Sequence, residues 1–282
     1  MIGRIAVVTD SASYLPDHVR RRFGVHVVPL TVTVDGREYR EGVDLDADLF
    51  YPMLQSATAV TTSQPSPGIM LEAYRAAAAE GATSIVSMHI GAALSGTLQS
   101  ARLAASMSPI PVTVIDSGQA SFAEGLVVWE VIDALAQGVD ADRAPDIARE
   151  ASARVGNTFV VKALDLMRRG GRLEQGARAD AVPVLAYSDG AVRVSGNADT
   201  VARAVTLMAE TIREASAAAR YGLRVGIGHG AAEPIARELR RHVCVMPGVD
   251  EVIDYIVGPS IGAHTGAGNA GAVFIERIPH EV

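Results

Sequence analysis

Four short segments of this chain are rich in serine, threonine and glycine and could bind an anion. Three follow apolar runs, at residues 9–13 (TDSAS), 91–97 (GAALSGT) and 116–121 (DSGQAS), and one precedes a helical pattern, at 61–68 (TTSQPSPG). Hydroxyl groups and backbone N–H groups at helix N-termini are favourable partners for an anion. Taken singly, each segment is more simply a helix N-cap. Because four similar segments recur, we expect them to meet at one sheet edge and to bind an anionic head group there.

Ser95, in ALSGT, is the serine best placed to act as a nucleophile. The glycine that a nucleophile elbow needs two positions before its serine is missing, so a helix N-cap or an anion donor is the favoured role. The alternative is a serine hydrolase or acyl transferase, in which His264 activates Ser95 and Asp10 or Asp116 orients the histidine. A third, weaker interpretation is a sensor that binds a sugar or a phosphate.

Two further histidines, His89 and His229, each end an apolar run. A histidine at a strand end is more often a satisfied structural group than a ligand, and neither has a second histidine at metal-binding spacing. We therefore expect no metal site.

The segment GPSIGAHTGAGNAG, residues 258–271, gathers glycines around His264 and Thr265. Such a loop can cradle a phosphate, but a P-loop also requires a lysine, and the only lysine of the chain is Lys162. We therefore expect a flexible loop without a nucleotide site of that kind. Arg172, in LMRRGGR, is suited equally to capping a helix C-terminus and to offering a guanidinium to an anion or a partner.

Strands alternate with helices up to about residue 155, which predicts a parallel sheet covered on both faces. Beyond that point a second Asp-Gly hairpin signal at 189–190, after the first at 35–36, and fewer crossover helices favour a mixed sheet in the second half. We expect an α/β protein of two domains: residues 1–155 as an α/β/α domain, and residues 156–282 as a two-layer α/β domain.

Composition narrows the function classes. The chain has 282 residues, a net charge of −7 and one cysteine, Cys244. The negative charge argues against nucleic acid, and the single cysteine favours a reducing cytoplasm. Asp10 interrupts the N-terminal apolar run too early for a signal peptide, and the most apolar helical stretch is too short to span a bilayer, so we expect no stable membrane insertion.

The segments VTDSASYLP, TTSQPSPG, LSGTLQSA, VIDSGQAS, LMRRGGR and GPSIGAHTGAG occur in an order that resembles the DegV family. Its members are the bacterial fatty-acid-binding proteins also called FakB. The resemblance implies that one long-chain fatty acid, such as palmitate, lies between the two domains. It also implies that the protein is not an enzyme and has no cofactor, and that it presents the carboxylate to a separate ATP-dependent, DAK-type fatty acid kinase, which makes acyl-phosphate.

The same resemblance implies roles for particular residues. Thr62 and Ser95 would bind the carboxylate, with Ser63 and Gly96 as neighbours. His264 and Thr265 would lie at the head group.

His264 would also take part in the phosphoryl contact, together with Arg172. Ala267 and Asn269 replace the proline and alanine of the family pattern, which predicts a looser loop. The stretch 194–203 lacks the family's basic residues except Arg203, which predicts altered docking to the kinase.

Overall fold

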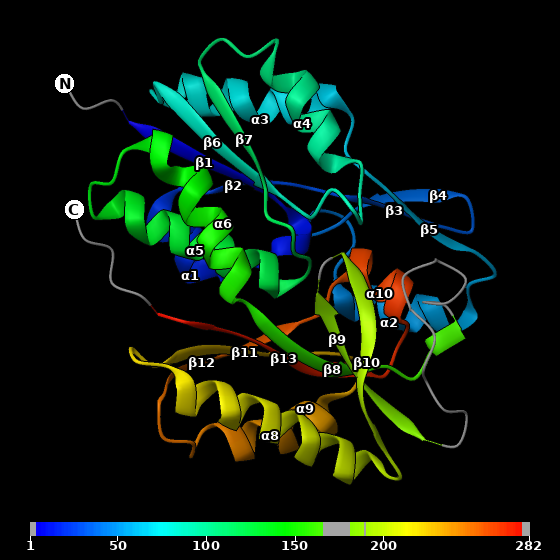
Figure 1. Ribbon diagram of the computed structural model, residues 1–282. Helices are drawn as coiled ribbons and strands as arrows, with labels where there is room; N and C mark the ends of the chain where they lie inside the picture. The colour runs from blue at the N-terminus through cyan, green and yellow to red at the C-terminus, as the bar shows by residue number, and fades with distance from the viewer. Residues whose placement is uncertain (1–3, 166–180, 189, 278–282) are drawn as a thin grey trace. The chain divides into compact units, whose positions relative to one another are not determined.

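The computed structural model describes residues 4–165, 181–188 and 190–277, in which strands and helices alternate (Figure 1). Among these residues, 4–45 and 58–153 form one compact unit, the first unit, and 46–57 and 154–277 form the second unit. The segment 46–57 thus groups with the second unit although it precedes residue 155. The predicted fold class, a parallel-sheet domain followed by a mixed-sheet domain, is confirmed.

The first unit is built on a parallel sheet in the order β2-β1-β6-β7. Figure 1 shows α3 and α4 on one face of it and α1, α5 and α6 on the other. Tyr74 and Met70 of α3 pack with Val8 and Ile85 of the strands in the core under α3 and α4. The elements of this unit are β1 (Ile5–Asp10), α1 (Asp17–Phe23), β2 (His26–Val28), α3 (Pro67–Ala79), β6 (Ser84–His89), α4 (Thr97–Ala105), β7 (Val112–Asp116), α5 (Phe122–Ala136) and α6 (Ala144–Arg154), with short 3₁₀ turns η1 (Ser11–Ser13) and η2 (Ala141–Arg143).

A small antiparallel sheet, β4-β3-β5, also belongs to the first unit. Its strands are β3 (Thr31–Val34), β4 (Arg37–Arg40) and β5 (Val60–Ser63). The hairpin predicted at Asp35-Gly36 is confirmed, and both residues have positive φ, +46° and +84°, as a tight two-residue turn requires. The hydroxyl-rich segment 61–68 is not all loop, because β5 pairs with β3 as far as Ser63.

The second unit contains a mixed sheet in the order β10-β9-β8-β13-β11-β12. In Figure 1, α8 and α9 cover one face, and their residues Met208, Ile212 and Leu239 are buried against the sheet. The elements are α2 (Ala47–Ser56), β8 (Gly156–Val160), β9 (Val182–Ser188), β10 (Ala191–Ala198), α8 (Val201–Ala218), β11 (Leu223–Gly230), α9 (Glu233–Val243), β12 (Val249–Ile256), α10 (Pro259–Thr265) and β13 (Asn269–Glu276).

The glycine-rich segment 258–271 is not a flexible loop throughout, contrary to the sequence prediction. Residues Pro259–Thr265 form helix α10, and Asn269 already begins strand β13. Pro259 supplies a first helical residue whose missing N–H costs nothing. Gly262 lets the helix approach α2 closely, since a Cβ atom there would lie 2.8 Å from the ring of Phe50 and 2.9 Å from the hydroxyl of Tyr51.

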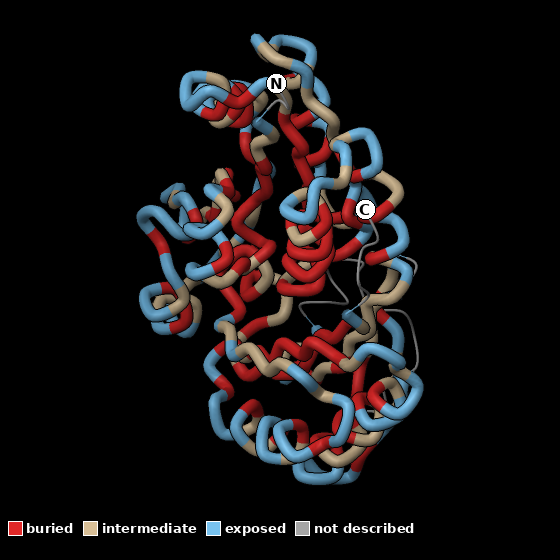
Figure 2. The backbone as a smooth tube through the Cα atoms, turned by 90° about the vertical axis from the view of Figure 1, so that its left-hand side faces the viewer, coloured by how far each residue is buried: buried red, intermediate tan, exposed pale blue. Residues whose placement is uncertain are grey.

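The strands differ in how far their residues are buried. Strands β1, β6, β11 and β13 are buried over most of their length, whereas most helices alternate between buried and exposed residues, coloured red and pale blue in Figure 2. Helix α5 is the exception, since nearly all of its residues are buried, including Glu124 and Glu130. Within the described ranges, no helix combines the length and the apolar character that a membrane crossing needs.

Candidate functional site

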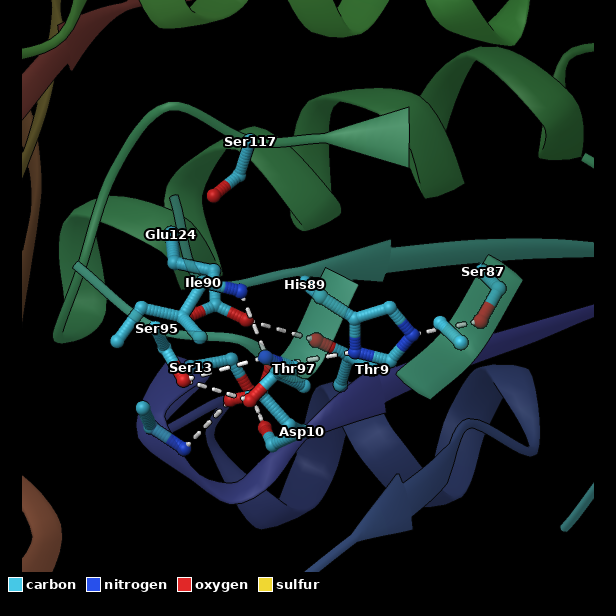
Figure 3. Close-up of polar contacts among 12 residues, drawn as sticks. Thr9, Asp10, Ser13, Ser87, His89, Ile90, Ser95, Thr97, Ser117 and Glu124 are labelled. Carbon is cyan, nitrogen blue, oxygen red and sulfur yellow. Dashed lines mark hydrogen bonds and ion pairs between the residues drawn. The ribbon is translucent and has the colours of Figure 1, made fainter. Parts of the chain in front are cut away.

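Three of the four hydroxyl-rich segments meet at one edge of the parallel sheet. Strands β1, β6 and β7 are neighbours and parallel, so the segments after Asp10, His89 and Asp116 leave the sheet at the same edge. Ligands of open α/β sheets bind at this edge. Figure 3 shows the polar residues that gather there.

Asp10 ties the first two of these segments together. Its Oδ1 accepts the N–H of Ala12 at 3.1 Å, and its Oδ2 accepts the N–H of Ile90 at 3.0 Å. The ring Nδ1 of His89 lies 3.2 Å from the same Oδ2, and both side chains are fully buried (Figure 3). The carboxylate of Asp10 therefore links two loops: the one that follows β1 and the one that follows β6.

A chain of hydrogen bonds leads from His89 into the core. Its Nε2 lies 2.7 Å from the hydroxyl of Ser87, which lies 2.9 Å from the hydroxyl of Tyr74. When Ser87 donates to Nε2 and Nδ1–H donates to Asp10, the hydroxyl of Tyr74 can donate to Ser87 or to the carbonyl oxygen of Ala101, 3.5 Å away. Burial raises the pKa of Tyr74 to about 12, so it stays a donor. The order Ser87–His89–Asp10 resembles a catalytic triad, but all three residues are fully buried, so no substrate reaches Ser87.

Two more carboxyl groups, Glu41 and Glu124, lie beneath the same loops. Glu41 accepts the hydroxyl of Ser11 at 2.6 Å, and Glu124 accepts the hydroxyl of Thr9 at 3.2 Å. Burial raises the pKa of Glu124 well above its ordinary value of 4.5, and the negative charges of Asp10 and Glu41 raise it further. Hydroxyl groups at the end of β1 and in η1 thus donate to buried carboxyl groups beneath them. Neither glutamate was predicted as part of the site.

Asp116, at the end of β7, serves the third loop in the same way. Its Oδ1 accepts the N–H groups of Gly118 at 2.9 Å and Ala92 at 3.2 Å. Asp10 and Asp116 together therefore use four backbone N–H groups that the sequence suggested for an anion. These four N–H groups are therefore not open to a ligand.

Ser95 is half-buried at the start of α4. Its hydroxyl lies 2.9 Å from that of Thr97 and accepts the Thr97 N–H at 3.3 Å (Figure 3). The N-cap residue is Gly96, which offers no side chain, so Ser95 performs part of the capping role predicted for it. In the described part of the chain, its hydrogen-bond partners include no histidine and no carboxylate. Asp10 and Asp116, the two carboxylates suggested for a hydrolase, accept hydrogen bonds from backbone N–H groups of the loops.

Thr62 and Ser63 reach the same region from the small sheet. Thr62 is half-buried in β5, opposite Val32 of β3, and Ser63 is exposed. The following residue, Gln64, lies directly on Gly96, since a Cβ atom at Gly96 would stand 2.9 Å from the Gln64 amide carbon. The segments that carry Thr62 and Ser95 are therefore in contact within the first unit.

His264 and Thr265 lie in the second unit, on the last turn of α10, and both are half-buried. Gly266 and Gly268, which follow them, have φ of +73° and +91°, a region that side chains rarely adopt. Lys162 covers this turn: its Cδ would stand 2.7 Å from a Cβ atom at Gly268. Arg172 lies outside the described residues.

His229 differs from the prediction made for it. Within the described residues its buried Nδ1 has no hydrogen-bond partner, whereas His89 is satisfied at both nitrogens. Burial lowers the pKa of His229, which favours the neutral ring. His229 is thus a neutral strand-end residue.

Two relatives match nearly the whole chain. A DegV domain-containing protein of Streptomyces coelicolor is 34% identical over 98% of this chain and 100% of its own length. Another, from Halalkalibacterium halodurans, is 34% identical over 97% of this chain and 99% of its own length.

Solved structures agree. A DegV family protein from Thermus thermophilus, described as fatty acid binding, superposes with a TM-score of 0.90 at 32% identity, covering 97% of this chain and 100% of that one. DegV of Bacillus subtilis, described as a fatty acid binding protein, superposes with a TM-score of 0.87 at 27% identity, over 98% and 100%. The model of the DegV family, which is described as uncharacterised, matches residues 4–277. The chain therefore belongs to the DegV family.

Proposed function

We propose that this protein binds one long-chain fatty acid, such as palmitate, and presents its carboxylate to a separate ATP-dependent fatty acid kinase of the DAK type. Thr62 and Ser95 donate their hydroxyls to the carboxylate, with Ser63 and Gly96 beside them. The protein itself is a lipid-presenting subunit, not an enzyme, and needs no cofactor. We infer a cytoplasmic location, where ATP is available. Two DegV proteins that share its fold are described as binding fatty acid.

The observation that supports a carboxylate as the bound head group is that backbone N–H groups of the loops already donate to protein carboxylates. Asp10 and Asp116 already accept the N–H groups of four loop residues. A phosphate, with two negative charges, would need those donors and would face the buried carboxyl groups of Glu41 and Glu124. A singly charged carboxylate needs fewer donors. Hydroxyls such as those of Thr62 and Ser95 suffice for it when an apolar tail supplies the affinity.

The tail can supply that affinity. A palmitate chain buries about fifteen methylene-like groups at ~0.8 kcal/mol each, on the order of 10 kcal/mol before the costs of ordering. A hydrogen bond to a charged group contributes roughly 1.5–3 kcal/mol. The hydroxyls therefore determine where the carboxylate lies, and leave its oxygen more reactive than a full salt bridge would.

In the transfer step, a carboxylate oxygen attacks the γ-phosphorus of ATP, the bond from that phosphorus to the β-γ bridging oxygen breaks, and ADP leaves. Negative charge grows on the transferred group during this step, and a histidine donor stabilises it. We assign this role to His264, accompanied by Thr265, and a partner or phosphoryl contact to Arg172.

Extraction of the purified protein with organic solvent, followed by mass spectrometry, tests the binding role. We expect about one fatty acid per chain, and its chain length and unsaturation identify the ligand. A protein that is empty and also fails to take up added fatty acid would refute the proposal.

Side-chain replacement tests the head-group roles. Thr62→Val and Ser95→Ala should each slow phosphorylation of bound fatty acid by an added kinase roughly 10- to 100-fold, the equivalent of one hydrogen bond to a charged group. Thr61→Val is the matched control, since Thr61 is the exposed neighbour of Thr62 on the opposite side of β5. Unchanged turnover in both test variants would contradict the assignment.

A serine-reactive fluorophosphonate tests the hydrolase alternative. Ser95 pairs with Thr97 rather than with a base, so we expect no labelling. Labelling that Ser95→Ala abolishes would establish the hydrolase instead.

A further inference from the structure

The side chain of Asn269 makes two hydrogen bonds to the end of α10. Its Nδ2 lies 2.9 Å from the hydroxyl of Thr265 and 2.7 Å from the carbonyl oxygen of Gly266. Asn269 is the first residue of β13, where it pairs with Gly230 of β11, and it is only 5% exposed. A buried side chain on a fixed strand therefore connects the sheet to the end of the helix that carries His264.

The direction of each hydrogen bond follows from its donors. The hydroxyl of Thr265 gives its single hydrogen to the carbonyl of Ile261, at 3.1 Å. It therefore receives a hydrogen from Asn269, and the second hydrogen of the same amide goes to Gly266. Both hydrogens of Nδ2 are used. The opposite amide orientation would place Oδ1 against the carbonyl of Gly266, which also has only lone pairs to offer.

Helix α10 depends on such support. It has seven residues, and a helix this short is unstable without tertiary contacts. At its beginning, the hydroxyl of Tyr51 donates to the carbonyl of Val257 at 2.9 Å, and the Tyr51 and Phe50 rings pack against Gly262. At its end the chain turns through Gly266, and the amide of Asn269 donates to the carbonyl oxygen of Gly266 there.

We propose that Asn269 is a positioning residue, which fixes the last turn of α10 so that the ring of His264 adopts one orientation for phosphoryl transfer. The proposal rests on the function proposed above for His264, and it concerns how that residue is held. It also assigns Thr265 a supporting role, because its only hydroxyl hydrogen is already donated to Ile261.

Asn269→Ala removes both hydrogen bonds and tests the proposal. Asn157→Ala is the matched control: its amide also makes two hydrogen bonds, with the backbone N–H and carbonyl of Tyr187, on strand β8 of the same sheet. Asn157 pairs with Val273, whereas the end of β8 nearest α10 pairs with Ala270. The control thus loses the same kind of contact at the other end of the strand.

The first readout is kinetic. With fatty acid bound and kinase and ATP added, Asn269→Ala should lower the rate of acyl-phosphate formation at least 10-fold, because a small displacement of a catalytic group costs that much or more. The dissociation constant for the fatty acid should change less than 3-fold. Asn157→Ala should retain wild-type turnover. Equal losses in the two variants, or none in Asn269→Ala, would overturn the proposal.

The second readout does not depend on the kinase. The ring resonance of His264, assigned by its loss in His264→Gln, should shift or broaden in Asn269→Ala and remain in place in Asn157→Ala. Asn269→Asp should be impaired at least as much as Asn269→Ala at neutral pH, because a carboxylate would face the Gly266 carbonyl. An unaltered His264 resonance in both Asn269 variants would refute the positioning role.

Failure of the proposed function is distinguishable from failure of this inference. If the wild-type protein neither binds fatty acid nor supports phosphorylation, the function proposed above is wrong. The ring resonance of His264 still decides whether Asn269 fixes the end of α10.

Discussion

The buried carboxyl group of Glu124 should make the stability of the first unit fall as pH rises. Its pKa in the folded protein lies well above 4.5, because it is buried and because Asp10 and Glu41 lie nearby. Between about pH 4.5 and the folded-state pKa, the folded protein keeps a proton that the unfolded chain releases. The free energy of unfolding therefore decreases across this window, by about 1.4 kcal/mol per pH unit for one proton.

Glu124→Gln removes this proton and keeps the acceptor for Thr9, which lies 3.2 Å from Glu124 Oε1. The variant should match the wild type near pH 4.5 and become progressively more stable than it as pH rises, by about 1.4 kcal/mol per unit until the folded-state pKa is passed. Glu72→Gln, at an exposed position of α3, should show no such divergence.

Denaturant unfolding at several pH values measures the difference. Trp129, the only tryptophan, lies on the same helix as Glu124 and is 6% exposed, so its fluorescence reports on the first unit. The fluorescence baselines of the folded and unfolded protein are fitted separately at each pH. A stability difference that is the same at every pH would refute the reasoning.

Three further outcomes follow from the site. Asp10→Asn should destabilise the first unit by about 3–5 kcal/mol in the same fluorescence assay, since an amide cannot accept from Ala12, Ile90 and His89 together; a loss below 1 kcal/mol would contradict this. Gly268→Ala should lower stability by roughly 1–2 kcal/mol in calorimetry, because φ is +91° and the Lys162 stem occupies the space, whereas Gly196→Ala, at ordinary φ, should cost less. A non-hydrolysable acyl-phosphonate should bind more weakly than the fatty acid of equal length in competition calorimetry, and tighter binding of the phosphonate would argue for a phosphate site.

Much of the fold was predictable because its elements are local. The alternation of apolar runs with helical patterns gave the parallel sheet, and Asp35-Gly36 gave the hairpin at the observed position. The placement of α2 could not be predicted in this way. Its residues Phe50 and Tyr51 pack on Gly262, more than 200 positions later, and no local pattern records such a contact.

The candidate site was predictable in its hydroxyls but not in its carboxyl groups. Serine and threonine before helices stand out in a sequence, whereas Glu124 looks like an ordinary helix charge until its surroundings are known. One signal was available: α5 is apolar except for Glu124, Glu130 and Asp133, and the two glutamates are buried. A charged residue in a helix that is apolar on all sides must be buried.

The expectation that Asn269 loosens the glycine-rich segment is wrong, for a related reason. An asparagine among glycines is typical of a turn. Here the amide lies at the first position of a strand, with the end of α10 beside it, and both of its hydrogens are used. An asparagine is compatible with a loose turn and with a fixed one. Only the tertiary surroundings of the Asn269 amide show that it stabilises the end of α10.

The carboxyl groups explain why loops so rich in glycine and hydroxyls need not bind phosphate. In a phosphate cradle the backbone N–H groups point at the ligand. Here Asp10 and Asp116 take those of Ala12, Ile90, Ala92 and Gly118 for themselves, so the loops are held rigid by internal anions. A second anion is then tolerated only where side-chain hydroxyls project, and only if its charge is low. Under the proposed function, the same arrangement should hold an acyl-phosphate more weakly than the fatty acid carboxylate, and so favour release of the product.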